Sequence, residues 1–363
     1  MNFLSNIKIG TKLWIGFGTV GLILATVVLL SIFKVSGSGV LTDRVIDLRA
    51  PTAKLGVELQ NGLNASLANL RGYMLLGKDK FESARVADWN DRINPGLAKM
   101  TELSRNWTVE ANKQKLATMK QDFAKLRQAQ DEIASISGTV DNLPATKILV
   151  EQAAPQAAIM SKEITAMIDE EGSLKATSAR KALLGMMADV RGSLGLGLAN
   201  IRAYLLTGSD TFRVQFDAHW RKNTTRFKDL QRNRGLLSST QSAAFRRFSS
   251  ARNIFDPLPP KMFAMRGSDE WNTANYWLGT KAAPVAAAIN VTLNGMIENQ
   301  QRLMNTDAGI ARESISALKW MLWILLGVGI VFAFGIASAV TRSIVKPIGQ
   351  VVERVETLRN TDI

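Results

Sequence analysis

The chain of 363 residues is 46% hydrophobic, carries 45 Lys and Arg against 31 Asp and Glu, and contains no cysteine. The absence of cysteine excludes a disulfide framework and a thiolate metal site. The formal charge of +14 is compatible with nucleic acid, a membrane surface or acidic small molecules as partners, so the location of the chain has to decide among them.

Two apolar segments without charged residues lie near the ends of the chain, at residues 13–33 and 320–341. Both have the length of about 20 residues that a helix needs to cross the hydrocarbon core of a bilayer. A cleaved signal peptide is the alternative for the first segment, but its apolar run is long and no small-residue cleavage site follows it. We therefore predict two transmembrane helices, and the membrane is one partner of the chain.

The charges beside these segments predict the orientation of the chain. The short ends, residues 1–12 and 342–363, carry basic residues next to the membrane, namely Lys8, Lys12, Arg342 and Lys346. Because basic flanks stay in the cytoplasm, residues 34–319 are predicted to lie outside. In a bacterium this makes a multi-pass protein of the inner membrane with a periplasmic domain. Nucleic acid is not expected there, and the positive charge points to anionic solutes or to a solvated surface.

An internal repeat organises the external region. Residues 67–81 recur as residues 198–212, displaced by 131 positions, with nine of fifteen residues identical. The same offset relates Trp89 to Trp220, and we expect both to be core residues that anchor their helices. Duplication explains this match better than chance does. We place the two copies at residues 40–172 and 174–316.

Each copy predicts a helical hairpin with a tight turn. Apolar residues recur at helical spacing up to the turn. Gly77 and Gly208, which suit the left-handed backbone conformation, are predicted to end the first helix of each copy. Asp79 and Asp210 are predicted to cap the helix that follows.

The external region contains no alternating strand pattern, so the predicted fold class is all-α. In each copy two short helices precede a longer one, with breaks near residues 138–144 and 256–260. The long helices are about twice as long as the hairpin helices, and both chain ends must return to the membrane. These lengths favour two stacked four-helix bundles that share the two long helices, with both hairpin tips at the junction. Two separate bundles side by side are the alternative.

Residues 342–363, after the second apolar segment, contain a short helical pattern. Ile348, Val351, Val355 and Leu358 follow one another at spacings of three, four and three. This apolar seam favours the pairing of two parallel helices. We therefore predict a homodimer.

These features together resemble the bacterial chemoreceptors, the methyl-accepting chemotaxis proteins. The resemblance lies in the order of a membrane span, a helical external sensor, a second span and a membrane-proximal Lys-Pro-Ile helix from Lys346. That last stretch resembles the first helix of a HAMP linker, within which the chain stops. The duplicated external region, with its runs at residues 275–278 and 281–284, resembles the helical bimodular sensor domain.

The resemblance implies a fold and a function. Its ligands would be small organic acids, among them tricarboxylic-acid-cycle intermediates and short carboxylates, bound between the helices of a bundle. The signal would pass through HAMP to a cytoplasmic output module, and from there to a histidine kinase and an adaptor protein. The sensor region of a membrane histidine kinase with a similar ectodomain is the alternative, and a structural membrane protein without a ligand is the third.

Arg71 and Arg202 are the first candidates for ligand binding. Each lies four residues from leucines on the apolar face of its helix. A guanidinium group grips a carboxylate through two parallel hydrogen bonds. The alternative is an arginine whose stem covers apolar surface while its head reaches water. Family members that bind dicarboxylates can carry two arginines one turn apart, whereas this chain has Ala68 and Met74 beside Arg71, which disfavours a four-carbon dicarboxylate.

Other polar side chains complete the candidate ligand-binding set. In the stacked arrangement, Asn275, Tyr276 and Thr280 are expected level with Arg71. Tyr73 and Tyr204 are hydroxyl donors for a carboxylate, with interhelical packing as the alternative. We find no catalytic constellation, metal-ligand spacing or cofactor motif, so we predict a receptor without cofactors and not an enzyme.

Overall fold

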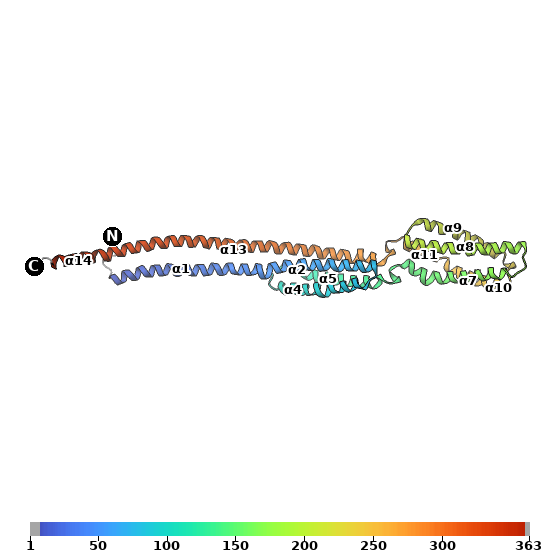
Figure 1. Ribbon diagram of the computed structural model, residues 1–363, viewed down its shortest axis with the longest axis horizontal. Helices are drawn as coiled ribbons and strands as arrows, with labels where there is room; N and C mark the ends of the chain where they lie inside the picture. The colour runs from blue at the N-terminus through green and yellow to red at the C-terminus, as the bar shows by residue number, and fades with distance from the viewer. Residues whose placement is uncertain (1–7, 360–363) are drawn as a thin grey trace. The chain divides into compact units, whose positions relative to one another are not determined.

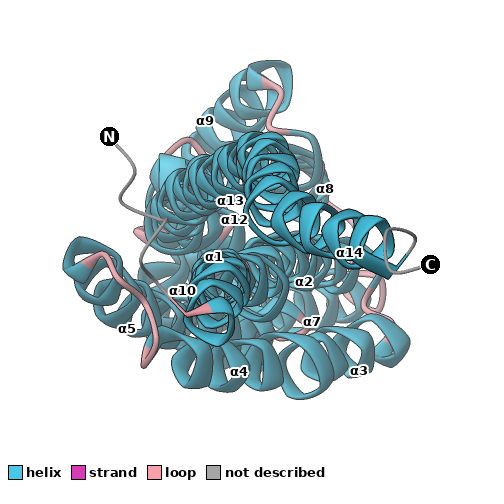
Figure 2. Cartoon of the chain, turned by 90° about the vertical axis from the view of Figure 1, so that its left-hand side faces the viewer, coloured by secondary structure: helices cyan, strands magenta, loops and turns pink. Residues whose placement is uncertain are grey.

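The computed structural model describes residues 8–359, and all regular elements in this range are helical (Figures 1 and 2). The predicted all-α fold class is thereby confirmed. The α-helices are α1 (Ile9–Arg44), α2 (Ala50–Leu76), α3 (Asp79–Ala87), α4 (Asn94–Ser104), α5 (Glu110–Ser137), α6 (Pro144–Ile148), α7 (Ala154–Glu171), α8 (Ser178–Thr207), α9 (Asp210–Arg232), α10 (Ser239–Phe255), α11 (Leu258–Arg266), α12 (Thr273–Trp277), α13 (Ala283–Val340) and α14 (Lys346–Arg359).

The chain forms two compact units. The first comprises Met1–Leu59, Gly96–Gln114 and Thr292–Ile363, and the second comprises Gln60–Pro95 and Lys115–Val291. The boundary between them falls inside helices α2, α4, α5 and α13. The first unit has its own apolar core outside the membrane-type segments, made by Leu48, Leu59, Met100, Trp107, Leu293 and Met296.

The second unit contains part of one helical bundle and the whole of another. In the complete bundle, α8 packs along α9 and α7 packs along α10, while α11 closes the end beside α6 (Figure 1). Its largest fully buried rings are Phe248 and Phe255. The other bundle is represented here by residues 60–95, 115–137 and 273–291, with a core that includes Leu63, Leu70, Trp89, Phe123, Leu126, Ile133 and Ile289.

Two chain segments pass from one bundle to the other within the second unit. Helix α5 continues through the 3-10 turn Val140–Asn142 and α6 towards α7, and α11 continues through the 3-10 turn Asp269–Trp271 and α12 towards α13. The predicted four-helix-bundle organisation, with long helices that are interrupted along their length, is thus confirmed. The break expected at residues 256–260 is present as a short turn at Asp256 and Pro257, between α10 and α11. Prolines there begin α11, because the first helical turn needs no N–H from them. The further interruption before α12, around the 3-10 turn Asp269–Trp271, was not predicted.

Five prolines of the described range lie where one helix continues into the next, and all five follow the same local rule. The π-turns Val45–Arg49, Asp88–Ile93, Leu149–Ala153, Leu278–Ala282 and Thr341–Val345 each end two residues before a proline. Proline lacks an N–H and its ring collides with the carbonyl four residues earlier. A wider turn, with bonds from residue i to residue i+5, removes that collision while the helix continues.

The two hairpin tips have the backbone that the sequence predicts. Gly77 has φ 61° and Gly208 has φ 71°, and among the described residues these are the glycines with positive φ. Their N–H groups donate to the carbonyls of Tyr73 at 2.8 Å and Tyr204 at 2.7 Å, which closes each helix. Glycine adopts this conformation without the steric cost that a Cβ atom brings.

Alanine at the two glycines is expected to destabilise the fold to different extents. At Gly77 a Cβ atom would meet no other atom within 4 Å, so only the left-handed backbone costs, about 1 kcal/mol. At Gly208 the same atom would lie 2.8 Å from Nη2 of Arg266, so the cost is expected to rise to about 2 kcal/mol. Thermal unfolding followed by circular dichroism measures both. Equal melting temperatures for Gly77→Ala and wild type would contradict the left-handed tip.

The prediction that Asp79 and Asp210 cap the helices after the tips is wrong. The capping positions are Lys78 and Ser209, and neither side chain makes a capping hydrogen bond. Asp79 and Asp210 are the first residues of α3 and α9. There each carboxylate stabilises the helix through its favourable position at the positive end of the helix dipole.

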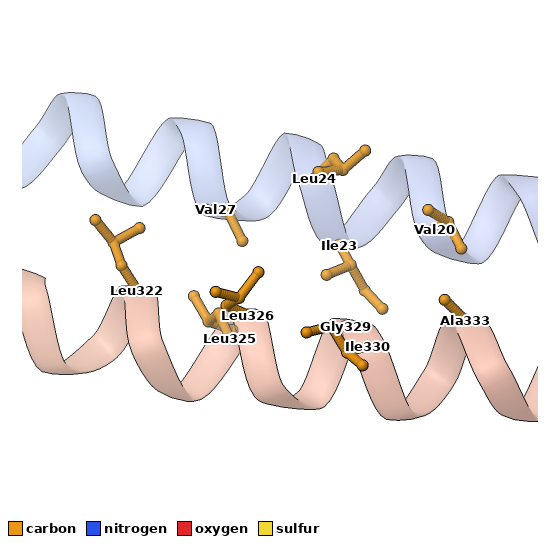
Figure 3. Close-up of a pocket in the computed structure, with 10 residues that line it drawn as sticks. All are labelled: Val20, Ile23, Leu24, Val27, Leu322, Leu325, Leu326, Gly329, Ile330 and Ala333. Carbon is orange, nitrogen blue, oxygen red and sulfur yellow. The ribbon is translucent and has the colours of Figure 1, made fainter.

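Two of the helices that are long and apolar enough to cross a membrane carry the predicted spans. Candidate spans lie within Gly10–Leu76 and Thr273–Ala339, and their most apolar windows are unburied. Helices α1 and α13 run side by side there, with an apolar gap of about 480 Å³ lined by residues such as Ile23, Val27 and Ile330 (Figure 3). Helix α8 also passes the length and composition test, but it places Leu183, Met187, Val190, Leu194 and Ile201 in the core of its bundle.

Candidate ligand-binding site

The end of α2 and the segment around α12 enclose a cavity of about 310 Å³. It lies wholly within the second unit, where the tip of the first hairpin meets the turn before α13. Its walls are partly apolar and partly polar. The lining residues are Arg71, Met74, Leu75, Asn142, Trp271, Asn272, Asn275 and Leu278. The structure therefore brings together Arg71 and Asn275, as the sequence predicts.

Arg71 is exposed at the mouth of this cavity, and no carboxylate of the described chain pairs with it. Other arginines of the same unit are engaged. Arg85 is buried and pairs with Glu82 at 2.6 Å and with Asp131 at 2.8 Å. A guanidinium without an internal partner, beside a cavity, is free to bind an external anion.

Two asparagines hold the backbone of the cavity wall. Oδ1 of Asn142 accepts the N–H of Ala274 at 2.9 Å, and Oδ1 of Asn272 accepts the N–H of Asn275 at 2.9 Å. Nδ2 of Asn142 donates to the carbonyl of Ser137 at 3.5 Å, so the amide nitrogen of Asn272 is the better placed donor for a ligand. Arg71 and Asn272 thus offer donors beside a space with apolar walls, an arrangement that suits a small anion with an apolar part.

The structure does not bring all the predicted residues to this cavity. Tyr276 is half-buried and does not line it. Thr280 is exposed, and its hydroxyl donates to the carbonyl of Tyr276 at 2.7 Å within the same helix. Tyr73 is half-buried with its hydroxyl beside Gly138. These three side chains point away from the cavity, although they are at a similar height along the bundle. The rotation of each helix about its own axis decides which of its residues face the cavity.

The second copy has a different environment. Arg202 is exposed and lines neither the cavity at Arg71 nor the one beside Tyr204. Tyr204 is buried, packs edge-on against Phe263 at 5.1 Å and donates a long hydrogen bond of 3.5 Å to the Phe263 carbonyl. The cavity beside it, of about 570 Å³, is lined by two aspartates, and its one arginine, Arg213, already pairs with Asp210 at 3.0 Å.

A chain of contacts joins the two hairpin tips. Nε of Arg266 donates to the carbonyl of Leu205 at 2.9 Å, near the end of α8. The same guanidinium lies 4.0 Å from the ring centre of Trp271, which lines the cavity at Arg71. Sequence patterns did not select Arg266, Asn142 or Asn272, although an Asn directly before a short helix is a recognisable capping signal.

Two carboxylates of the second bundle have pKa values below their ordinary range. A hydrogen bond from Lys222, together with the charges of Lys222 and Arg226, lowers the pKa of Asp189. A hydrogen bond from Arg247 at 2.6 Å lowers the pKa of Glu163. Both carboxylates are therefore held in their ionised form by basic neighbours on α9 or α10.

Acid is expected to weaken the second bundle through these pairs. Because the native pKa values are lowered, the stabilisation is present in full above the unfolded values of about 4. It is lost as the pH falls through the lower native values. Unfolding midpoints at pH 6 and pH 3 measure the loss, and the Glu163→Gln, Asp189→Asn double variant should show a smaller drop. An identical drop in variant and wild type would contradict this origin.

The fold defines a helical sensor module attached to membrane-type helices at both ends. Residues 6–182 match the family model described as a four helix bundle sensory module for signal transduction. Over these residues, just under half of the chain, it is similar to the sensory modules of methyl-accepting chemotaxis proteins, in agreement with the resemblance seen in the sequence. Comparison with curated proteins gives no match.

Proposed function

We propose that this chain is the sensory and transmembrane part of a chemoreceptor that binds a small organic anion. The observation that carries the proposal is the unpaired guanidinium of Arg71 at the mouth of a cavity of about 310 Å³. A carboxylate there would accept hydrogen bonds from Arg71, while its carbon chain would contact Met74, Leu278 and Trp271. One available arginine fits one carboxylate group, so monocarboxylates fit better than dicarboxylates.

The proposed topology keeps the boundaries that the sequence suggests. Residues 1–12 and 342–363 lie in the cytoplasm, residues 13–33 and 320–341 cross the bacterial inner membrane, and residues 34–319 form the periplasmic sensor. Ligand binding shifts α13 along its axis by about 1–2 Å, the scale of helix movements at interfaces. The family match and the apolar windows of α1 and α13 support this arrangement.

On the cytoplasmic side, we propose that α14 is the first helix of a HAMP linker and pairs with α14 of a second copy. Ile348, Val351 and Val355 are each at least half exposed, which leaves an apolar face for a partner helix. Disulfide trapping of full-length protein through Val351→Cys tests this pairing. No dimers at Val351 or at neighbouring seam positions would argue against it.

The alternative function is the sensor region of a membrane histidine kinase, which has the same parts up to this point. The two classes differ in the segment after the linker: a methylated coiled coil in one, a phosphotransfer helix in the other. Reading the codons after Ile363 distinguishes them. In both cases the protein signals and performs no chemistry in the part described here.

A thermal-shift screen of the full chain in lipid nanodiscs tests the anion proposal. A ligand that binds only the folded state raises the melting temperature. The panel contains monocarboxylates, dicarboxylates, inorganic anions, amines and sugars. We expect a rise with at least one carboxylate. A response to amines alone would instead point to the aspartate-lined cavity beside Tyr204 and would refute the proposal.

A further inference from the structure

A buried group of charged and polar side chains lies in the first unit, between α1 and α13. Arg49 is 1% exposed and Asp307 is 6% exposed, and Nε of Arg49 lies 3.3 Å from Oδ2 of Asp307. The other guanidinium nitrogens donate to Thr108 at 2.9 Å and to Gln300 at 3.5 Å. Buried charges are costly unless they are paired, so Asp307 needs a cation in every position it occupies.

Asp307 has a second cation within reach. Nη1 of Arg44 lies 3.5 Å from Oδ1 of Asp307, and the Arg44 side chain is 35% exposed. One carboxylate therefore lies between two arginines from the same stretch of chain. Oδ1 of Asp307 faces Arg44, and Oδ2 of Asp307 faces Arg49.

The π-turn before Pro51 puts both arginines on the same side. In an α-helix, side chains five residues apart differ by about 140° around the axis, so Arg44 and Arg49 would face different directions. The turn Val45–Arg49 closes with a bond from the N–H of Ala50 to the carbonyl of Val45. Because such a turn closes after five residues, it brings residues five apart closer to one face. Through this turn, Pro51 allows Arg44 and Arg49 to face the same carboxylate.

The two helices involved are those that continue into the membrane-type segments. Asp307 stands 13 residues before Trp320, which is about 20 Å along α13. Along α1, Arg44 is nearer to its apolar segment than Arg49 is. A slide of α13 towards the membrane would therefore carry Asp307 away from Arg49 and towards Arg44.

We propose that Arg44, Arg49 and Asp307 form a two-position ion-pair lock that sets the register of α13 against α1. In one position Asp307 pairs chiefly with Arg49, and in the other chiefly with Arg44. The carboxylate stays paired throughout, so the slide exposes no lone buried charge. The inference rests on the proposed function in one respect, that α13 moves along its axis.

The absence of natural cysteine allows the register to be read by disulfide formation. Ser38 on α1 donates to the carbonyl of Ala311 on α13 at 3.4 Å, so Ser38→Cys with Ala311→Cys reports the present register. Ser38→Cys with Ala308→Cys, one turn earlier on α13, reports a slide towards the membrane. The ratio of the two crosslinking rates is measured in the full chain in nanodiscs, without any ligand.

Opposite responses to the two arginines are the expected signature. Arg49→Gln leaves Arg44 as the partner of Asp307 and should raise the ratio of the Ala308 to the Ala311 crosslink at least about twofold, for a slide of about 1–2 Å. Arg44→Gln removes the alternative partner of Asp307 and should lower the ratio below its wild-type value. Arg49→Lys keeps the charge and should restore the wild-type ratio.

Shifts in the same direction for both arginine variants, or no shift in either, would overturn the lock. Circular dichroism shows whether each variant folds. If Arg49→Gln does not fold, Asp307→Asn provides the second test, because without the carboxylate Arg44→Gln should no longer change the ratio. A change that persists would refute the proposal. Since no ligand is used, failure here leaves the anion proposal untouched, and a negative ligand screen leaves this result untouched.

Discussion

Replacing Arg71 by alanine is expected to abolish carboxylate binding while the protein remains folded. Arg71 is exposed and makes no ion pair within the described chain, so its removal should change the free energy of unfolding by less than about 0.5 kcal/mol. Loss of a charge-assisted contact to a carboxylate should weaken binding at least about thirtyfold, or about 2 kcal/mol. Isothermal titration of the full chain with the carboxylate that raises the melting temperature measures this loss.

Arg202→Ala is the matched control. Arg202 has the same place in the second copy, is also exposed and lies outside the cavity at Arg71. The control variant should therefore bind like wild type. If Arg71→Ala binds normally but melts earlier, the arginine has a structural role, and its stem covers apolar surface.

Replacing Trp89 by alanine is expected to cause the largest loss of stability, about 3–5 kcal/mol. Trp89 is 2% exposed and packs edge-on against Phe123 at 6.1 Å. Its Nε1 donates to Oε1 of Gln130 at 2.8 Å, and Nε2 of Gln130 donates to Ser66 at 3.1 Å. Alanine would leave a large cavity and an unpaired amide in the core of the first bundle. Chemical denaturation at constant detergent measures the change.

The variant Trp89→Phe distinguishes the contribution of ring packing to stability from that of the hydrogen bond to Gln130. Phenylalanine keeps most of the apolar volume, so only the buried amide of Gln130 is left unsatisfied, at about 1–3 kcal/mol. A loss for Trp89→Ala no larger than that for Trp89→Phe would contradict the packing role. Trp220, predicted to be a core residue of the second copy, is only half-buried, so Trp220→Ala should cost less than Trp89→Ala.

The helices and the tips of the hairpins could be predicted because they depend on local sequence. Helical spacing of apolar residues is read directly, and a glycine after the last apolar residue indicates a left-handed end, as Gly77 and Gly208 show. The π-turns were not predicted. At Pro51 and Pro155 the helix continues through a wider turn that packing in a bundle supports, and the sequence pattern alone does not distinguish such a turn from a regular helix.

The candidate site could be predicted only in part. Arg71 and Asn275 share a cavity, but Tyr276 and Thr280 do not reach it, although they are close to Asn275 in sequence. Neighbouring residues of a helix point in different directions, and the rotation of a helix in a bundle depends on long-range packing. The repeat also suggested equal roles for Arg71 and Arg202. The two tips have different neighbours, since the second one packs against α11 and Arg266.

Arginine-selective labelling tests most directly whether Arg71 holds the ligand. The full chain in nanodiscs is treated with phenylglyoxal, with and without the carboxylate that gives the largest thermal shift, and labelling of each arginine is measured by mass spectrometry. Arg71 and Arg202 are both exposed, so both should react in the absence of ligand. We predict that the carboxylate protects Arg71 and leaves Arg202 unchanged. Equal labelling of Arg71 with and without a carboxylate that binds would contradict the proposed site.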